Sequence, residues 1–419
     1  MVNRLTVAGA IIALYLIGAL VTPHLVDERD IENWDSKEYW LDNPKLAPPE
    51  WVSFFNKGLP RGEKLKTKDG RTFEYDFHYS RAPKDMVIFI NNSDSKRVSI
   101  TIETPSGKRY TLYKGYPMKK ILISRQVVRL MEIAKDKGLN TTETDILFGD
   151  SLLPVFFVKE GDKVAPEKGR YRITVNASGE VGVKVLGRTY GLMGTDVMGR
   201  NIWSGFLWGL RETVWMVLLT GTIAVFLGSL FGLVSSMTGK LGWLGDSLAK
   251  FSALLPVVPL MIALVPVMGE VSVGGRLEMS TFWFSTAIAL ALMGKVSRNV
   301  KAIVDVELSK DYVKSARAVG GSTWWILKHH ISRVVLPYSI YQLSLLIPKI
   351  VALISLLGFF SAAPGFNWGT MLAMVINENQ LYSGAWWLVL PIGFALAFFA
   401  FAFVLINREM EKRFMEVFY

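Results

Sequence analysis

The sequence predicts an α-helical membrane protein with six transmembrane helices and a β-rich extracytoplasmic domain inserted between helices 1 and 2. Of its 419 residues, 51% are hydrophobic, which is more than a soluble protein of this length usually contains. The apolar residues gather in one stretch at the N-terminus and in most of the chain after Thr213, whereas residues 24–190 have the composition of a soluble domain. We therefore expect a transmembrane helix at 1–23, the extracytoplasmic domain at 24–193 and a helical core at 194–419.

The first helix is predicted from Leu5–Thr22, about 18 uncharged residues, which is enough to cross the ~30 Å hydrocarbon core of a bilayer. Arg4 precedes this stretch and acidic residues follow it, so the N-terminus is expected in the cytoplasm. A cleaved signal peptide is the alternative interpretation. The length of the stretch and the immediate Pro23 favour a retained helix.

Five further apolar stretches predict the remaining spans. They are Thr213–Met237, Leu248–Gly269, Ser280–Val296, Tyr338–Phe360 and Ala385–Ile406. The stretch at Leu248–Gly269 contains three prolines. A membrane helix tolerates proline where neighbouring helices or cavity water bind the freed carbonyl groups.

The loops between the spans indicate the orientation of the chain. Ser297–Arg333 holds seven Lys and Arg residues against three acids, whereas Phe359–Gly384 holds no Lys or Arg. The tail after Ile406 is basic again. Because basic loops stay in the cytoplasm, we expect a multi-pass protein of the plasma membrane, with both termini in the cytoplasm and residues 24–193 outside.

The outer region contains short runs of β-branched and aromatic residues, most of them separated by Gly, Pro, Asn or Asp turn signals. The runs are Val87–Ile90, Val98–Glu103, Arg109–Lys114, Val155–Lys159, Tyr171–Asn176 and Val181–Leu186. Ser124–Lys137 instead has an apolar period of about 3.6 residues and is followed by Gly138, which predicts a helix. A small β-sandwich with one helix fits this pattern.

Several function classes are excluded by composition. The net charge of +11 is compatible with a nucleic-acid binder, but basic cytoplasmic loops explain it better, and we expect no nucleic-acid partner. With no cysteine and four histidines, a metal site is not predicted. No G-x-x-x-x-G-K-[ST] phosphate loop occurs, so this chain is expected to bind no cofactor and to hydrolyse no ATP.

Two other functions compete with transport. An enzyme acting within the membrane would need clustered Asp, His or Ser residues inside the spans, and Lys349 is the only deep charge there. A membrane-anchored receptor or sensor with an extracellular ligand-binding domain is the alternative function. About 13 residues follow the last span, which leaves little room for a signalling output domain.

The segment Asp311–Pro337 is the strongest local signal. On a helix, Tyr312, Ala316 and Val319 fall on one face and Lys310, Lys314 and Arg317 on the other. Gly320 and Gly321 are expected to end that helix. Composition alone would describe a basic loop that obeys the positive-inside rule. A short helix along the cytoplasmic surface could also act as a lever on the membrane helices.

The order of residues in this segment resembles the EAA loop of ABC importer permeases, in the oligopeptide/dipeptide form and its C-type subunit. There a helix of the type EYVEAARALGAS is followed by HIL and later by a proline. The matching residues here are Asp311, Tyr312, Val313, Ala316, Arg317, Ala318, Val319, Gly320, His330, Ile331, Leu336 and Pro337. Lys314 and Ser315 stand in place of the family's Glu and Ala, and Ser332, Arg333 and Val334 in place of Leu-Pro-Asn.

Two further segments are similar to the same family. Gly194–Asn201, followed by Ser204 and Gly209–Arg211, resembles its GTDxxGRD…S…GxR segment before the second span. Asn367–Leu372 resembles its SWGxML segment in the last outer loop. Together with the EAA-type loop, the resemblance covers about Gly194–Phe414.

The resemblance implies a transport subunit rather than an enzyme, translocating peptides or oligosaccharides. It implies four kinds of partner: a second homologous permease, two ATPase subunits that carry ATP and Mg, an extracellular solute-binding protein and the lipid bilayer. The EAA-type coupling loop, 298–337, would receive the movement of the ATPases. The implied coupling residues are Asp311, Tyr312, Lys314, Ser315, Ala316, Arg317 and Gly320.

Four residues are candidates for the translocation path or its gate. Lys349 lies about 18 Å into the membrane at 1.5 Å per residue from Pro337, where a charge usually faces a cavity or a partner. It would line the path or pair with an acid of the second permease. Asp196 and Arg200 would form an outer gate or belong to a helix that merely lies on the membrane surface. Trp368 completes the set.

Overall fold

The computed structural model describes residues 4–67, 69–91, 97–139, 155–158, 166–237, 239–271 and 277–418. The chain divides into two compact units. A helical unit comprises Met1–Glu32, Ser204–Leu381 and Val389–Tyr419, and a β-rich unit comprises Asn33–Trp203 and Tyr382–Leu388. Each unit is treated separately.

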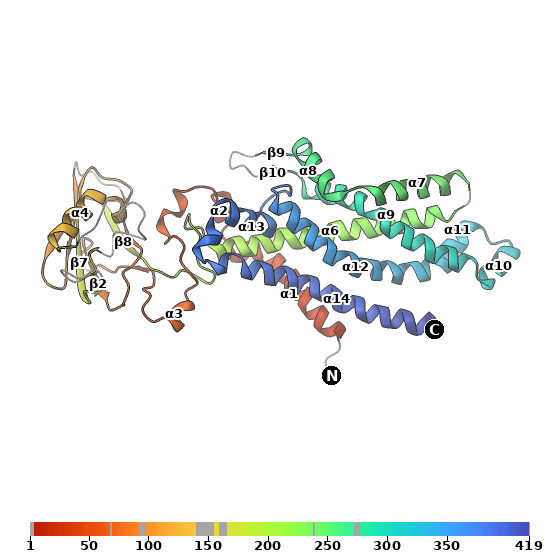
Figure 1. Ribbon diagram of the computed structural model, residues 1–419, viewed down its shortest axis with the longest axis horizontal. Coiled ribbons are helices and arrows are strands. Elements are labelled where there is room, and N and C mark those ends of the chain that lie inside the picture. Colours follow the sequence, from red (N-terminus) through yellow and green to blue (C-terminus); the bar gives the residue numbers. More distant parts are fainter. Residues whose placement is uncertain are drawn as a thin grey trace. The chain divides into compact units, whose positions relative to one another are not determined.

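The helical unit is built from apolar helices, most of them long and running side by side, whereas α8 turns away from α7 (Figure 1). They are α1 (Arg4–Leu25), α6 (Ile202–Ser235), α7 (Lys240–Leu254), α8 (Val257–Met268), α9 (Thr281–Leu308), α12 (Ser332–Phe359) and α14 (Leu390–Phe418). Shorter elements connect them: α2 (Glu28–Glu32), α10 (Asp311–Ala318), α11 (Thr323–Ile326), the π-helical turn η4 (Leu327–Ile331), α13 (Trp368–Asn377) and a hairpin of β9 (Glu270–Val271) and β10 (Leu277–Glu278).

Four helical segments in the described part of the chain are long and apolar enough to cross a membrane. They are Arg4–Leu25, Ile202–Ser235, Thr323–Phe359 and Trp386–Lys412, and the bent pair of α7 and α8 would make a fifth. The predicted span at Ser280–Val296 forms α9, but α9 is not in this set because Lys295 and Arg298 dilute its apolar stretch. A helical membrane protein is therefore observed, and the count of six spans stays a prediction.

The predicted span at Leu248–Gly269 is not one continuous helix. The chain bends by 84° between Lys240–Leu254 and Val257–Val265. Pro256 is the cause, because proline has no N–H to donate and forces the preceding residue out of the helical conformation. Leu255 accordingly has φ −65° and ψ 125°. The sequence showed the prolines, but the direction taken by the chain after them depends on packing.

The predicted span at Tyr338–Phe360 begins earlier than its proline suggested. α12 starts at Ser332 and runs through Pro337 and Pro348. Each internal proline removes one helical hydrogen bond, which is tolerated where neighbouring helices pack against the helix. The loop preceding α12 is consequently joined to it by continuous helical backbone, through η4.

The β-rich unit contains two antiparallel four-stranded sheets. One has the order β1 (Glu63–Lys64), β8 (Glu180–Leu186), β3 (Asp85–Asn91) and β6 (Lys120–Leu122), and the other β2 (Thr72–Phe77), β7 (Gly169–Asn176), β4 (Val98–Glu103) and β5 (Arg109–Gly115). In register, Ile88 lies opposite Val183 and Phe73 opposite Ile173. The unit also holds α3 (Val52–Phe55), α4 (Val127–Asp136) and the 3-10 turns η1 (Tyr39–Asp42), η2 (Ile123–Arg125) and η6 (Trp386–Leu388).

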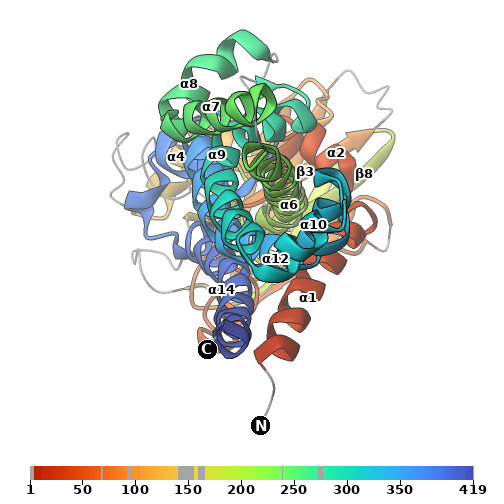
Figure 2. The same ribbon diagram turned by 90° about the vertical axis from the view of Figure 1, so that its right-hand side faces the viewer.

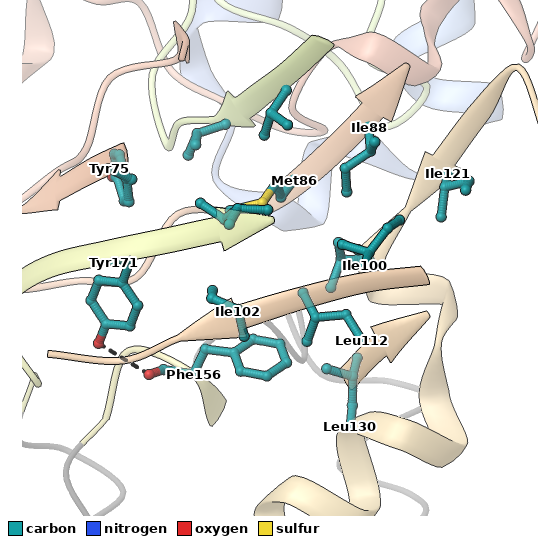
Figure 3. Packing of buried hydrophobic residues seen from close by; sticks show 14 of the residues in the cluster. Tyr75, Met86, Ile88, Ile100, Ile102, Leu112, Ile121, Leu130, Phe156 and Tyr171 are labelled. Carbon is teal, nitrogen blue, oxygen red and sulfur yellow. Dashed lines mark hydrogen bonds between the residues drawn. The ribbon is translucent and has the colours of Figure 1, made fainter. Parts of the chain in front are cut away.

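A hydrophobic core fills the β-rich unit, because alternate residues of a strand point to the same face of its sheet. Along β2, Phe73, Tyr75 and Phe77 are each 1% exposed, and the residues between them are more exposed. Figure 3 shows the packed side chains, among them Ile88, Ile100, Ile102, Leu112, Ile121 and Leu130. The hydroxyl of Tyr171 donates a hydrogen bond to the carbonyl oxygen of Phe156 at 3.1 Å (Figure 3).

Most strands lie on the runs that the sequence pattern indicates. One run differs: Val155, Phe156 and Phe157 form no strand, and Val158 makes only an isolated bridge to Pro166. Lys159 lies outside the described residues. The helix expected at Ser124–Lys137 is α4, preceded by the short turn η2. The extracytoplasmic position of this unit stays a prediction.

Lys137 provides a test of the β-rich unit's stability. Its ammonium group is 3% exposed and donates hydrogen bonds to the carbonyl oxygens of Phe156 and Val158, at 3.1 and 2.9 Å, and to the carboxylate of Glu167 at 3.2 Å. We expect Lys137→Ala to lower the free energy of unfolding by about 3 kcal/mol, because two buried carbonyl groups and the partly buried carboxylate of Glu167 lose their cation. The loss is measured by urea unfolding, with hydrogen exchange of the backbone amides in β7 as the signal.

The exposed Lys135, in the last turn of α4 and two residues before Lys137, supplies the matched control. Lys135→Ala is expected to change the free energy of unfolding by less than ~0.5 kcal/mol. Equal effects of the two substitutions would show that the buried ammonium contributes nothing specific.

Candidate functional site

The loop between α9 and α12 is shaped by two adjacent glycines. Gly320 has φ +93°, a left-handed conformation that residues with a side chain rarely adopt. It ends α10, and the N–H of Gly321 donates to the carbonyl oxygen of Ala316 at 2.9 Å, as in a helix C-terminal cap. The hydroxyl of Ser322 then accepts from the N–H of Trp325 at 3.3 Å and starts α11.

Helix α10 is fastened to the end of α9 through Glu307. The Tyr312 hydroxyl donates to one carboxylate oxygen of Glu307, and the Lys310 ammonium lies 2.9 Å from the other. Glu307 is 4% exposed, and Val313 beneath α10 is fully buried. A short helix with one buried hydrophobic residue gains most of its anchoring from such contacts.

The charges of this contact are set by its surroundings. Burial acts to raise the pKa of Glu307, but the hydrogen bonds from Tyr312 and Lys310 outweigh it and lower that pKa below its ordinary value. Burial and the hydrogen bond to Glu307 raise the pKa of Tyr312 to about 12. An ionised carboxylate therefore accepts a hydrogen bond from a neutral phenol over the whole neutral range.

An aromatic cluster joins α10 to the segment that enters α12. The ring centres of Tyr312 and His330 are 5.4 Å apart, and those of Trp325 and His330 are 5.2 Å apart. His329 stacks on Trp325 at 4.8 Å. Because His330 belongs to η4 and η4 continues into α12, α10 contacts the bases of both α9 and α12.

The remaining predicted coupling residues lie on the surface of the loop. Asp311, Lys314, Ser315 and Arg317 are exposed, and Ala316 is half-buried. Lys314 pairs with Asp311 at 2.9 Å, an exposed ion pair of the kind that adds little stability. The lysine at the family's acidic position thus has a partner within its own helix.

Two functional candidates were missed by the sequence analysis. Glu307 is one, although an acid followed by Lys310 at i+3 and Tyr312 at i+5 could have suggested it. Trp324 is the other: it is 70% exposed, and Val319 beside the glycines is 89% exposed. Exposed apolar side chains on a loop indicate a surface that a partner covers.

Asp196 and Arg200 form a buried ion pair within the β-rich unit, and they are 3% and 2% exposed. One carboxylate oxygen of Asp196 accepts from the N–H groups of Met198 and Arg200, both at 2.9 Å. The other accepts from the guanidinium of Arg200. The guanidinium carbon also lies 5.4 Å from the centre of the Trp34 ring. The pair therefore closes a tight turn directly before α6.

Trp368 is fully buried within the helical unit. It opens α13, where Asn367 and Thr370 form a capping box. Its indole N–H donates to the carbonyl oxygen of Phe206 at 2.9 Å. A Cβ atom on Gly209 would lie 2.7 Å from the Trp368 ring, so the glycine of the GxR segment allows α13 to approach α6 closely.

Lys349 differs from the other path candidates because it is exposed. It follows Pro348 on α12, and the described residues include no ion pair or hydrogen bond for its side chain. The structure thus brings the coupling residues together in one loop. It places Lys349 and Trp368 on different elements of the helical unit and Asp196 with Arg200 in the β-rich unit.

Comparisons with known proteins show what this chain is similar to. Residues 224–416 match the family described as "Binding-protein-dependent transport system inner membrane component". A putative peptide transport system permease protein of Brucella suis is 28% identical over 228 residues, which cover 52% of this chain and 71% of that protein. The probable D,D-dipeptide transport system permease protein DdpC of Escherichia coli is 29% identical over 197 residues, covering 46% and 62%.

A third relative is the di/tripeptide transport system permease protein DppC of Pseudomonas aeruginosa, 28% identical over 204 residues, which cover 47% of this chain and 63% of that protein. Among solved structures, an inward-facing form of the MetNI methionine ABC transporter aligns with 50% of this chain and 97% of its own, at 16% identity and a TM-score of 0.39.

Proposed function

We propose that this chain, whose residues 224–416 match the family of binding-protein-dependent transport permeases, is a permease of a peptide-type ABC importer and forms one half of a path that carries peptides across the plasma membrane. Such permeases are multi-pass membrane proteins and transport subunits rather than enzymes. The second half would come from a homologous permease. Two ATPase subunits with ATP and Mg would act on the cytoplasmic side, and a solute-binding protein would deliver the cargo.

The observation that carries this proposal is the anchoring of α10. The residues that follow α10 present Val319 and Trp324 to a partner, while Glu307 and His330 connect α10 to α9 and to the turn that leads into α12. A push on α10 is therefore passed to two membrane helices at once. Exposed apolar residues on one side and fixed contacts on the other are what a coupling loop needs in order to receive an ATPase.

Further parts of the proposal follow from the sequence. The six spans, the cytoplasmic termini and the outer location of residues 24–193 complete the topology. Asp311, Lys314, Ser315 and Arg317 would contact the ATPase by their exposed polar groups. Asp196, Arg200 and Trp368 would shape the outer end of the path by holding backbone in place, and Lys349 would contact the path itself. The named functions of the relatives favour peptides over oligosaccharides, and nothing favours a receptor.

The direct test is ATP-driven uptake of labelled short peptides by the assembled importer in proteoliposomes. We expect Trp324→Ala to reduce both uptake and ATPase binding at least ~10-fold, as loss of a central interface tryptophan commonly does. Trp243→Ala is the matched control, because Trp243 on α7 is 71% exposed and Trp324 is 70% exposed. Failure of the unsubstituted assembly to accumulate any peptide would refute the proposed function.

A further inference from the structure

Helices α9 and α12 of the helical unit share a polar contact. The side-chain amide of Asn299 donates to the side-chain oxygen of Gln342 at 3.2 Å. The two helices lie side by side in both views (Figures 1 and 2). The hydrogen bond fixes which faces of the two helices meet, and so which other residues lie near that seam.

Two lysines lie on these same faces. Lys295 precedes Asn299 by four residues on α9, and Lys349 follows Gln342 by seven residues on α12, so each stands one or two helical turns from the paired amides. Arg298 lies beside Asn299. All three cationic side chains are exposed. In the part of the chain that the structure describes, none of the three has an ion pair or hydrogen bond.

Two neighbouring cations, by contrast, are paired with an acid. Lys301 on α9 and Lys250 on α7 both bind the carboxylate of Asp246, at 2.8 and 2.6 Å. Along α9 the first acid after Arg298 is Asp305, two helical turns away. Cations one turn apart on a helix repel each other, so the face with Lys295 and Arg298 is poised for an added negative charge.

A charged side chain inside the membrane is stable only next to water or a group of opposite charge. Placing a lysine at the centre of a membrane helix costs about 2.5–3.5 kcal/mol, and such residues face a partner or a water-filled cavity. Lys349 lies roughly 26 Å from the start of α12 at 1.5 Å per residue, well within the span Thr323–Phe359. An exposed, unneutralised lysine at that depth indicates an aqueous surface rather than lipid.

We propose that Lys295, Arg298 and Lys349 form a cationic lining of the translocation path that favours peptides with acidic side chains. The inference rests on the proposed function, because it assigns a cargo class to the same path. The carboxylate of the cargo would supply the negative charge that the seam between α9 and α12 lacks. Neutral peptides would pass this lining without that attraction.

The first test uses the absence of cysteine from the sequence. Single variants Lys349→Cys and Lys295→Cys in the assembled importer are treated with anionic and cationic water-soluble methanethiosulfonates of similar size, and the mass of this chain is followed. We expect both thiols to react about ten times faster with the anionic reagent, because the remaining cations concentrate anions. Thiols that do not react, or that react equally fast with the two reagents, would contradict the proposal that these residues line the path.

The control thiol is Phe226→Cys on α6, where the native side chain is 67% exposed. The sequence from Thr213 to Ser235 contains no Lys or Arg. No preference for the anionic reagent is expected there. A preference as large as that at position 349 would assign the effect to the whole membrane surface and not to this seam.

The second test compares two peptides that differ only by Glu and Gln. We expect Lys349→Gln to lower uptake of the Glu peptide about tenfold relative to the Gln peptide, and Lys349→Arg to retain the preference. Lys250→Gln, on α7, is the matched control and should leave the ratio unchanged. Equal loss for both peptides would overturn the selectivity. If the unsubstituted importer carries neither peptide, the proposal that this importer carries peptides fails. The reaction rates of the Lys349→Cys and Lys295→Cys thiols still test whether the three cations line an aqueous path.

Discussion

Gly320→Val is expected to abolish coupled uptake while the chain still inserts and assembles. Gly320 has φ +93°, and a β-branched residue held in that region costs about 1–3 kcal/mol. The chain relieves this strain by unwinding the end of α10, which breaks the hydrogen bond between Gly321 and Ala316. A change of about 1–3 kcal/mol in free energy changes the population of the conformation in which α10 contacts α9 by about 5–150-fold.

Two matched substitutions isolate the effect of Gly320. Gly320→Asn should retain much of the uptake, because asparagine tolerates left-handed backbone better than other residues. Gly239 also has a positive φ, +87°, and no atom lies within 4 Å of the place that a Cβ atom would take there. Gly239→Val thus places a β-branched residue at another positive φ, in the connection between α6 and α7. If Gly320→Val and Gly239→Val reduced peptide-stimulated ATPase activity equally, the coupling role of α10 would be lost.

Glu307→Gln is expected to release α10 from α9 and to weaken coupling strongly. The substitution removes the ion pair between Glu307 and Lys310 and replaces the charge-assisted bond from Tyr312 by a neutral one. We expect a local loss of about 2 kcal/mol, the range for hydrogen bonds to charged groups. Peptide uptake and hydrogen exchange in α10 measure the two consequences.

A double-mutant cycle with Tyr312→Phe tests whether the two residues act together. Contacting residues show coupling energies of about 0.5–3 kcal/mol, so the double variant should be less damaged than the sum of the single variants. Asp305→Asn removes an exposed acid from the same helix and serves as the control. Strict additivity of Glu307→Gln and Tyr312→Phe would show that the hydrogen bond has no role in the anchoring.

The pKa values of this pair also predict a pH dependence. The folded-state pKa of Glu307 is lowered, so its stabilisation is complete above the ordinary value of 4.5 and is lost as the pH falls through the lowered value. The pKa of Tyr312 is raised from 10.0 to about 12, so its contribution is complete below 10.0 and is lost as the pH rises through 12. The stabilisation of α10 by this pair should be constant between these limits. The Glu307→Gln variant should show no loss of stability as the pH falls through the lowered pKa of Glu307.

Much of the coupling loop could be predicted from the sequence, because its features are local. An amphipathic octapeptide followed by two glycines predicts a short helix with a defined end, and α10 ends as expected before Gly320. Most strands of the β-rich unit were likewise indicated by runs of β-branched and aromatic residues between turn residues. These properties depend on neighbours within a few positions, which the sequence itself places together.

The contacts of single side chains could not be predicted, because they depend on which elements pack against each other. Nothing near Asp196 indicates that its carboxylate is buried against Arg200, whose guanidinium lies over Trp34, and not open at a gate. Burial of Trp368 depends on α6, whose contact residue Phe206 lies 162 positions away. In the same way, the hydrogen bond between Asn299 of α9 and Gln342 of α12 joins positions 43 residues apart, which no local pattern indicates.

The sequence by itself determined the apolar helices, the strands and the basic loop with its ordered motif, since hydrophobic periodicity and glycine conformation act within each segment. Only the tertiary structure decided which of the motif's residues hold the loop and which remain free for a partner. The physical reason is that burial of a charge such as Glu307 is favourable only when Tyr312 and Lys310 are brought to it, and that depends on the fold of the loop against α9.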